Sequence, residues 1–262
     1  MTTSPAIDRN LSHLANKVPE VTMWFWIIKV LCTTVGETVA DYLNVTLGFG
    51  LTGTTVVMVG ALVVALVLQF RAKGYIPGVY WVNVVLISVV GTLITDNLTD
   101  RFNIGLKLST AIFIVLLALS FLWWFNSEGT MSIHSIRTSR REGFYWSAIL
   151  LTFALGTAAG DLVSEQFALG YWRAAIVFAA AIAFVVATHF MLHINAIVSF
   201  WSAYVLTRPL GGSLGDYLSQ PKSSGGLGIG TTATSVIFLI AIAAVVAYLT
   251  SSKVDVIAEP KP

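Results

Sequence analysis

The apolar and polar residues of this chain fall into long alternating blocks. Eight apolar runs, each close to the roughly 20 residues that an α-helix needs to cross a bilayer, are separated by short polar segments. The runs are continuous and lack the period-two alternation of strands, so they predict helices. They span residues 22–43, 51–70, 77–98, 104–125, 144–166, 169–190, 196–218 and 227–249. The pattern predicts an all-α membrane protein with eight transmembrane helices.

One short frame recurs four times along these runs. Each copy ends in an aspartate, with a glycine five residues before it and a tryptophan fifteen residues before it. A second glycine lies nine residues after the aspartate, where the return helix is expected to begin. The four aspartates are Asp41, Asp96, Asp161 and Asp216. The sequence therefore predicts one two-helix unit that is repeated four times along the chain. Because each unit has an even number of helices, we expect parallel repeats around a pseudo-twofold or pseudo-fourfold axis along the membrane normal.

Polar segments divide the chain further. Residues 1–20 and 251–262 are predicted cytoplasmic tails, and residues 127–143 form the longest internal loop, also cytoplasmic. Residues 21–126 hold the first membrane half, with repeats 1 and 2, and residues 144–250 hold the second half, with repeats 3 and 4. Lysine and arginine are commoner on the side of the tails than on the side of the aspartates. The positive-inside rule therefore predicts both termini in the cytoplasm and the aspartates outside.

Composition supports a membrane protein and excludes other classes. The 262 residues are 56% hydrophobic and 11% charged, and the mean hydropathy is +0.81, whereas a soluble domain carries about 25% charged residues. A net charge of +2 without basic runs argues against a nucleic-acid partner. No nucleophile and base stand at a spacing typical of an enzyme, so we expect no catalytic activity and no cofactor other than a divalent cation.

The repeated aspartates are the first candidate site. The four aspartates occupy the same position in each repeat, so we expect their carboxyl groups at the same depth in the membrane. Four negative charges so close together are energetically unfavourable unless a cation or protons neutralise them. Oxygen ligands favour hard cations such as Mn²⁺, Mg²⁺ or Ca²⁺, or a proton. The predicted ion or metal ligands are Asp41, Asp96, Asp161 and Asp216.

Lys29, Glu37 and Arg208 also lie within the apolar runs, and they break the fourfold likeness because the other repeats have no equivalents. Glu37 lies one helical turn before Asp41 and adds a fifth carboxylate to the candidate site. Arg208 lies inside the seventh helix, and we expect it to pair with Glu37 or with an aspartate. The alternative is that Arg208 bonds carbonyl groups freed by Pro209. Lys29 is expected to extend to the cytoplasmic face.

These features predict a cation transporter or channel, either specific for a divalent metal such as manganese or proton-coupled. Its partners are the lipid bilayer and a small cation, and the sequence leaves the oligomeric state open. The alternative is a non-catalytic interaction or assembly protein, in which the aspartates only cap the loops that follow them. An intramembrane enzyme acting on lipid is a third class, and it lacks the residues for catalysis.

The segments that carry a resemblance are residues 25–31 leading to Gly36 and Glu37, residues 144–146, and residues 206–211 leading to Gly215 and Asp216. They resemble a family of bacterial multi-pass proteins known only as uncharacterised or "membrane-anchored" proteins, and the likeness covers about residues 20–250. The resemblance implies a bacterial inner-membrane protein and no particular activity. The first unit departs from the Gly-Asp pattern of the last two, because Ala40 precedes its aspartate.

Overall fold

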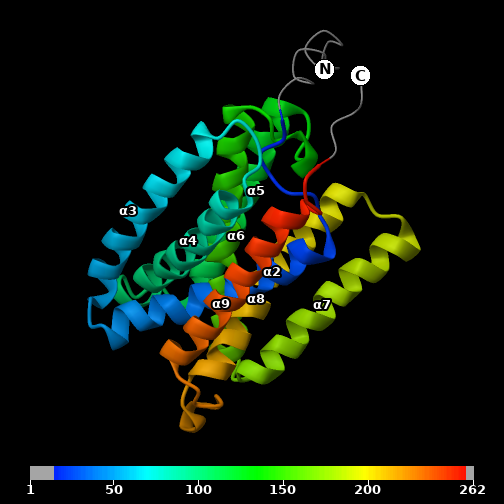
Figure 1. Ribbon diagram of the computed structural model, residues 1–262. Helices are drawn as coiled ribbons and strands as arrows, with labels where there is room; N and C mark the ends of the chain where they lie inside the picture. The colour runs from blue at the N-terminus through cyan, green and yellow to red at the C-terminus, as the bar shows by residue number, and fades with distance from the viewer. Residues whose placement is uncertain (1–14, 258–262) are drawn as a thin grey trace, which may run out of the picture.

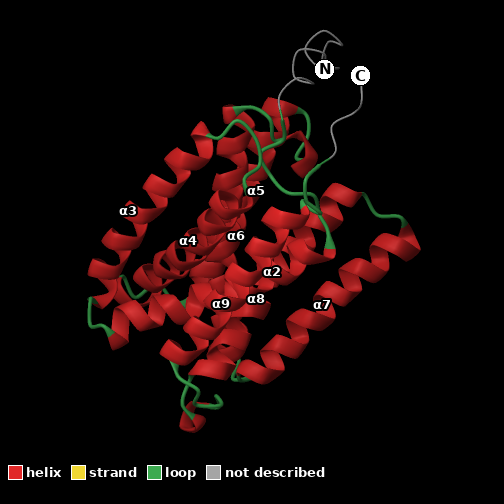
Figure 2. Ribbon diagram, in the orientation of Figure 1, coloured by secondary structure: helices red, strands yellow, loops and turns green. Residues whose placement is uncertain are grey.

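The computed structural model describes residues 15–257, so the predicted tails 1–20 and 251–262 lie partly outside the described residues. Every regular element in this part of the chain is helical (Figure 2). The eight long helices are α2 (Met23–Asp41), α3 (Gly50–Arg71), α4 (Pro77–Asp96), α5 (Leu106–Glu128), α6 (Ser139–Asp161), α7 (Tyr171–Leu192), α8 (Ala196–Ser219) and α9 (Thr231–Ser252). The predicted eight-helix, all-α fold is confirmed.

Seven of these helices are long and apolar enough to cross a membrane, counted over residues 15–257. The remaining helix, α8, carries Arg208 and Asp216 together with several glycines, and is less apolar for that reason. It contacts α2, α6 and α7, which surround it with apolar neighbours. The chain is a helical membrane protein, and α8 lies among its other long helices.

The first helix of each repeat lies inside the molecule, and the second lies outside. α2, α4 and α6 bury most of their apolar span, whereas α3, α5, α7 and α9 bury little of theirs. The inner helices form a closed ring, in which α2 contacts α4, α4 contacts α6, α6 contacts α8, and α8 contacts α2. Each outer helix packs on the inner helix of the following repeat: α3 on α4, α5 on α6, α7 on α8, and α9 on α2. Figure 1 shows α3 and α7 on opposite flanks with the inner helices between them.

Four glycines, one in each repeat, let neighbouring inner helices approach closely. Each is the glycine five residues before the aspartate, and it faces the residue three positions before the equivalent glycine of the next repeat. The pairs are Gly36 with Ser88, Gly91 with Phe153, Gly156 with Arg208, and Gly211 with Thr33. A Cβ atom on any of these glycines would lie no farther than 2.6 Å from its partner's side chain. The small residues therefore set the diameter of the ring.

The connection after the aspartate differs from the predicted short loop. In the first three repeats a five-residue π-helical turn follows the aspartate directly, at Tyr42–Thr46, Asn97–Arg101 and Leu162–Gln166. In the fourth repeat, α8 continues past Asp216 to Ser219. The return helix of this repeat then begins at Thr231 instead of near Gly225, where the repeat pattern predicts it. The fourth repeat is therefore the irregular one on this side of the ring.

Both ends of the described chain meet on one side of the bundle, which we name the tail side. The amide of Glu20 donates to the carbonyl of Asp255 at 2.8 Å, and the amide of Lys17 donates to the carbonyl of Ile136 at 2.9 Å. The linker between α3 and α4 joins them there, since the amide of Tyr75 also bonds the segment before α2. The aspartate-bearing ends of the inner helices lie on the opposite side, named the aspartate side.

The glycine contacts give the first testable prediction. Gly91→Ala is expected to lower the melting temperature of the detergent-purified protein, because a methyl group has no room between α4 and α6, and overpacking costs about 1–3 kcal/mol. Gly60→Ala in α3 is the matched control, since a Cβ atom there meets nothing within 4 Å. Equal melting temperatures for the two variants would show that the ring does not depend on these contacts.

Candidate functional site

Positions four, eight, twelve and sixteen residues before each aspartate lie on one ridge of each inner helix. The four ridges together form five layers along the ring. From the tail side they are the tyrosine layer (Phe25, Tyr80, Tyr145, Phe200), the lysine layer (Lys29, Val84, Ile149, Tyr204), the arginine layer (Thr33, Ser88, Phe153, Arg208), the glutamate layer (Glu37, Thr92, Thr157, Gly212) and the aspartate layer (Asp41, Asp96, Asp161, Asp216). All members of the three middle layers are buried. Equivalent positions of the repeats thus carry different chemistry.

Arg208 holds three inner helices together. Its side chain is fully buried, and Nη2 donates to Glu37 Oε2 on α2 at 2.6 Å and to Thr92 Oγ1 on α4. Nη1 donates to the carbonyl oxygen of Thr33 at 3.3 Å. The expected pairing with Glu37 is therefore present. The guanidinium reaches across to α2 and α4, which does not fit the alternative in which it bonds carbonyl groups of its own helix next to Pro209.

The four aspartates lie within electrostatic range of one another. The charge of Glu37 acts on the carboxyl group of each of them, and the charge of Asp41 acts on each of the other three. Gln220, one turn after the fourth aspartate, donates its amide to Asp41 Oδ2 at 3.2 Å. Glu165, in the π-helical turn after α6, adds an acid that the repeat pattern did not single out.

These carboxyl groups do not form a ready-made coordination shell. Within residues 15–257, no group of three or more His, Cys, Asp or Glu side chains lies close enough together to hold a metal ion. The aspartates do not cap the following turns either: the side chains of Asp41, Asp96 and Asp161 make no capping hydrogen bond. The capping explanation is therefore wrong for these three residues.

Lys29 does not reach the cytoplasmic face as predicted. Its side chain is fully buried in the lysine layer, with Nζ 4.0 Å from the ring centre of Phe153 and 4.1 Å from that of Tyr204. Phe153 belongs to α6 and Tyr204 to α8, so the ammonium group lies between inner helices. Snorkelling keeps the charged head of a lysine in water, whereas no part of Lys29 is exposed.

Four consecutive segments of the chain match one protein family, described as a repeat of unknown function, DUF347. The matched segments are residues 24–75, 79–130, 144–195 and 199–255. The chain belongs to this family. No curated protein and no solved structure matches it. Each DUF347 repeat coincides with one pair of inner and outer helices, which confirms the fourfold repeat and agrees with the uncharacterised repeat-containing family that the sequence resembles.

Sequence reasoning missed the tyrosines on the inner face of the DUF347 ring. The hydroxyl groups of Tyr80 and Tyr145 share a hydrogen bond in the tyrosine layer, and Tyr204 lies one layer nearer the aspartates. All three are fully buried. Their signal was present in the sequence, since each lies twelve or sixteen residues before the aspartate of its own repeat.

Polar contacts close the DUF347 ring on the tail side. The hydroxyl group of Tyr75 donates to Asp255 Oδ2 at 2.5 Å. Burial raises the pKa of the Asp255 carboxyl above its usual range, and the hydrogen bond from Tyr75 partly offsets this rise. Nearby, Lys17 Nζ bonds Glu142 Oε2 at 2.8 Å, and Gln69 Nε2 donates to the other oxygen of the same carboxylate at 3.0 Å. The segment before α2 is thus fixed to the ends of α3 and α6.

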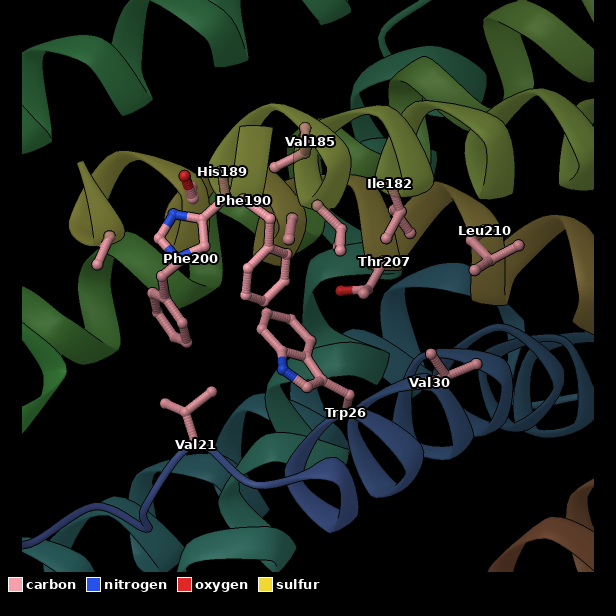
Figure 3. A pocket seen from close by; sticks show the side chains of 14 residues that line it. Val21, Trp26, Val30, Ile182, Val185, His189, Phe190, Phe200, Thr207 and Leu210 are labelled. Carbon is pink, nitrogen blue, oxygen red and sulfur yellow. The ribbon is translucent and has the colours of Figure 1, made fainter. Parts of the chain in front are cut away.

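A separate cavity of about 490 Å³ lies between α2, α7 and α8 (Figure 3). Its lining is mainly apolar, with Trp26 projecting from α2 and Phe190 from α7. Neither Glu37 nor any of the four aspartates lines it. The cavity is therefore distinct from the acidic site, and its apolar walls suit a hydrocarbon chain of the surrounding lipid.

The buried ion pair gives the second prediction. Glu37→Gln is expected to lower the melting temperature strongly, because it leaves the Arg208 guanidinium buried without its counter-charge, and breaking a buried pair in this way costs about 3–5 kcal/mol. The double variant Glu37→Gln/Arg208→Met removes both charges and is expected to melt above the single variant. Glu128→Gln, which breaks the tail-side pairs with Arg140 and Arg141, is the control, and is expected to cost less. A double variant that melts below Glu37→Gln would contradict the pairing.

Proposed function

We propose that this protein is a membrane carrier for a small cation, and that the aspartate layer and Glu37 attract and neutralise that cation. The charge balance of the site supports this proposal. Six carboxyl groups interact on the aspartate side, those of the four aspartates, Glu37 and Glu165. Among residues 15–257, Arg208 is the one cationic side chain in an ion pair with any of them. An excess of buried negative charge is unfavourable unless protons or a cation balance it.

The chemistry of the site favours a hard cation as cargo. Its charged groups are carboxylates, which suit a proton or a divalent ion such as Mn²⁺, Mg²⁺ or Ca²⁺. Because the carboxylates do not converge into a coordination shell, a divalent ion would keep part of its water or draw the acidic side chains together. Such an ion is transported cargo in this proposal and not a resident cofactor.

In this proposal Arg208 is the internal counter-charge that the cation replaces. A cation that reaches Glu37 competes with the guanidinium for the same carboxylate, since the two oxygens of Glu37 lie within one layer of the aspartates. Gly212 leaves room for that exchange: a Cβ atom there would lie 2.8 Å from Arg208 Nη1. The fully buried lysine layer closes the ring below, which favours a carrier over an open channel.

The remaining expectations belong to the same proposal. We assign the protein to the bacterial inner membrane with both termini in the cytoplasm, and we expect no enzymatic activity and no nucleic-acid partner. The lipid bilayer is its first partner, because the outer helices carry large exposed apolar side chains such as Val63, Leu119 and Phe184. The rival interpretation as an assembly protein relied on aspartates that cap loops, and it has no support from those contacts.

The test is transport by purified protein in lipid vesicles. Gradients of Mn²⁺, Mg²⁺, Ca²⁺ or protons are imposed in separate batches, and ion-sensitive dyes inside the vesicles record uptake. We expect the wild type to move at least one of these ions, and Asp96→Asn and Asp161→Asn to move it roughly tenfold more slowly, since losing one charge-assisted contact costs about 1.5 kcal/mol or more.

Glu20→Gln is the control for these variants. It removes the same charge from an exposed residue near the tail side, where Glu20 contacts His134, and it is expected to transport like the wild type. A wild type that moves none of the four ions would overturn the proposal. Aspartate variants that transport at the wild-type rate would overturn the role assigned to the aspartate layer.

A further inference from the structure

Lys29 is a buried cation that the proposed function does not yet use. It lies in the second turn of α2, fully enclosed by the inner helices. Its Nζ atom has no hydrogen-bond partner among residues 15–257. The contacts that it does make are with the ring faces of Phe153 and Tyr204.

This environment stabilises a permanent charge poorly. Ring faces attract an ammonium group, but they do not replace the three hydrogen bonds that it makes in water, and an unpaired charge in a protein interior is strongly unfavourable. An apolar side chain of similar length would therefore make the bundle more stable. Lysine differs from arginine in that it releases its proton when its surroundings disfavour the charge. A lysine at this position is suited to changing its protonation state.

Arg208 is the charged group that can drive such a change. It lies one layer nearer the aspartates, and its positive charge acts on Lys29. Its Nε atom is also buried without a hydrogen-bond partner in the described part of the chain. The guanidinium is therefore held by the hydrogen bonds of Nη1 and Nη2 and not by Nε. Tyr204 lies four residues before Arg208 on α8, and its ring covers Lys29.

The other titratable groups around Lys29 are few. Cys32 on α2 and Arg208 on α8 act on it electrostatically, and the ring of Tyr204 covers it. Tyr80 and Tyr145 belong to the next layer on the tail side, and Glu37 lies one layer beyond Arg208. The titratable residue of α9 is Tyr248, which packs on Trp24 at the tail end of α2. The acid in this set, Glu37, is already bound to Arg208. Any change in the Glu37–Arg208 pair therefore alters the electrostatic field at Lys29.

We propose that Lys29 exchanges one proton for the cation bound at Glu37, so that the carrier is proton-coupled. This inference rests on the proposed function. When the cation takes the place of Arg208 at Glu37, the freed guanidinium repels the Lys29 ammonium, which gives up one proton and becomes a neutral amine. When the cation leaves, Arg208 returns to Glu37 and the amine takes up one proton again. The released proton leaves toward the tail side, where the tyrosine layer, with its hydrogen bond between Tyr80 and Tyr145, adjoins the lysine layer.

The experiment measures cation and proton movement together. Vesicles containing the protein receive a gradient of Mn²⁺, Mg²⁺ or Ca²⁺ in separate batches, and two dyes inside report the cation and the pH. In the wild type we expect cation movement to change the internal pH. In Lys29→Met we expect the proton signal to fall to the level of empty vesicles, while the melting temperature rises by about 2–4 °C because the unpaired ammonium is gone. Lys107→Met, on the exposed start of α5, is the control and is expected to keep the proton signal.

The possible outcomes separate this inference from the function on which it rests. If Lys29→Met still moves protons with the cation as the wild type does, the inference is wrong and the carrier proposal stands. If the wild type moves a cation without protons, the inference is also wrong. If the wild type moves no cation and no protons, both proposals fall. A variant that loses the proton signal but also melts lower than the wild type would assign Lys29 a structural role and overturn the inference.

Discussion

The close approach of the inner helices at four glycines is the constraint on which the rest of the molecule depends. Each glycine accepts a side chain or backbone segment of the next repeat where any other residue would collide. The inner helices are consequently so close together that a single side chain can reach from one helix to two others. That closeness lets Arg208 bond α2 and α4 at once, and it encloses Lys29 between two aromatic rings.

Symmetry and chemistry are divided between different positions of the repeat. The glycines, the aspartates and the packing of outer on inner helices recur in every repeat, and together they build the scaffold. The charged residues of the middle layers do not recur: Lys29 and Glu37 belong to the first repeat, and Arg208 to the last. These two repeats adjoin because α8 contacts α2. The charged residues that occur only once therefore lie where the first and the last repeat contact each other.

Periodic and local features could be predicted from the sequence. The eight helices, the four repeats and the pairing of Arg208 with one of the acidic residues followed from run length, spacing and the high energy of a lone charge in a membrane. The position of each helix in the ring could not be predicted, because inner and outer runs are both apolar throughout. Lys29 was misjudged for this reason, since its direction depends on whether α2 is an inner or an outer helix.

The turn after the aspartate was unpredictable for a different reason. A loop and a π-helical turn accept similar residues over five positions, and hydrogen bonding within the folded chain decides between them. The residues on the inward ridge of each inner helix could have been predicted from the sequence. They follow by counting back in steps of four from each of the four aspartates. Tyr80 and Tyr145 were overlooked because tyrosines near the ends of apolar runs are usual in membrane proteins, and Tyr204 because it lies deeper in an apolar run.

Because α9 packs on α2, the last repeat contacts the first, and the arrangement of the helices does not depend on which repeat comes first in the chain. Every repeat contacts one repeat on each side, with the last contacting the first, and the described ends meet through the bond between Glu20 and Asp255. A circularly permuted chain, opened between α5 and α6 and joined at the present ends, would keep every interhelical neighbour. A chain of two repeats would bury only half of its inner faces, and would complete them by pairing with a second copy. The four-repeat chain has the arrangement of such a dimer joined into one polypeptide, and a single polypeptide can carry Lys29, Glu37 and Arg208 once instead of twice.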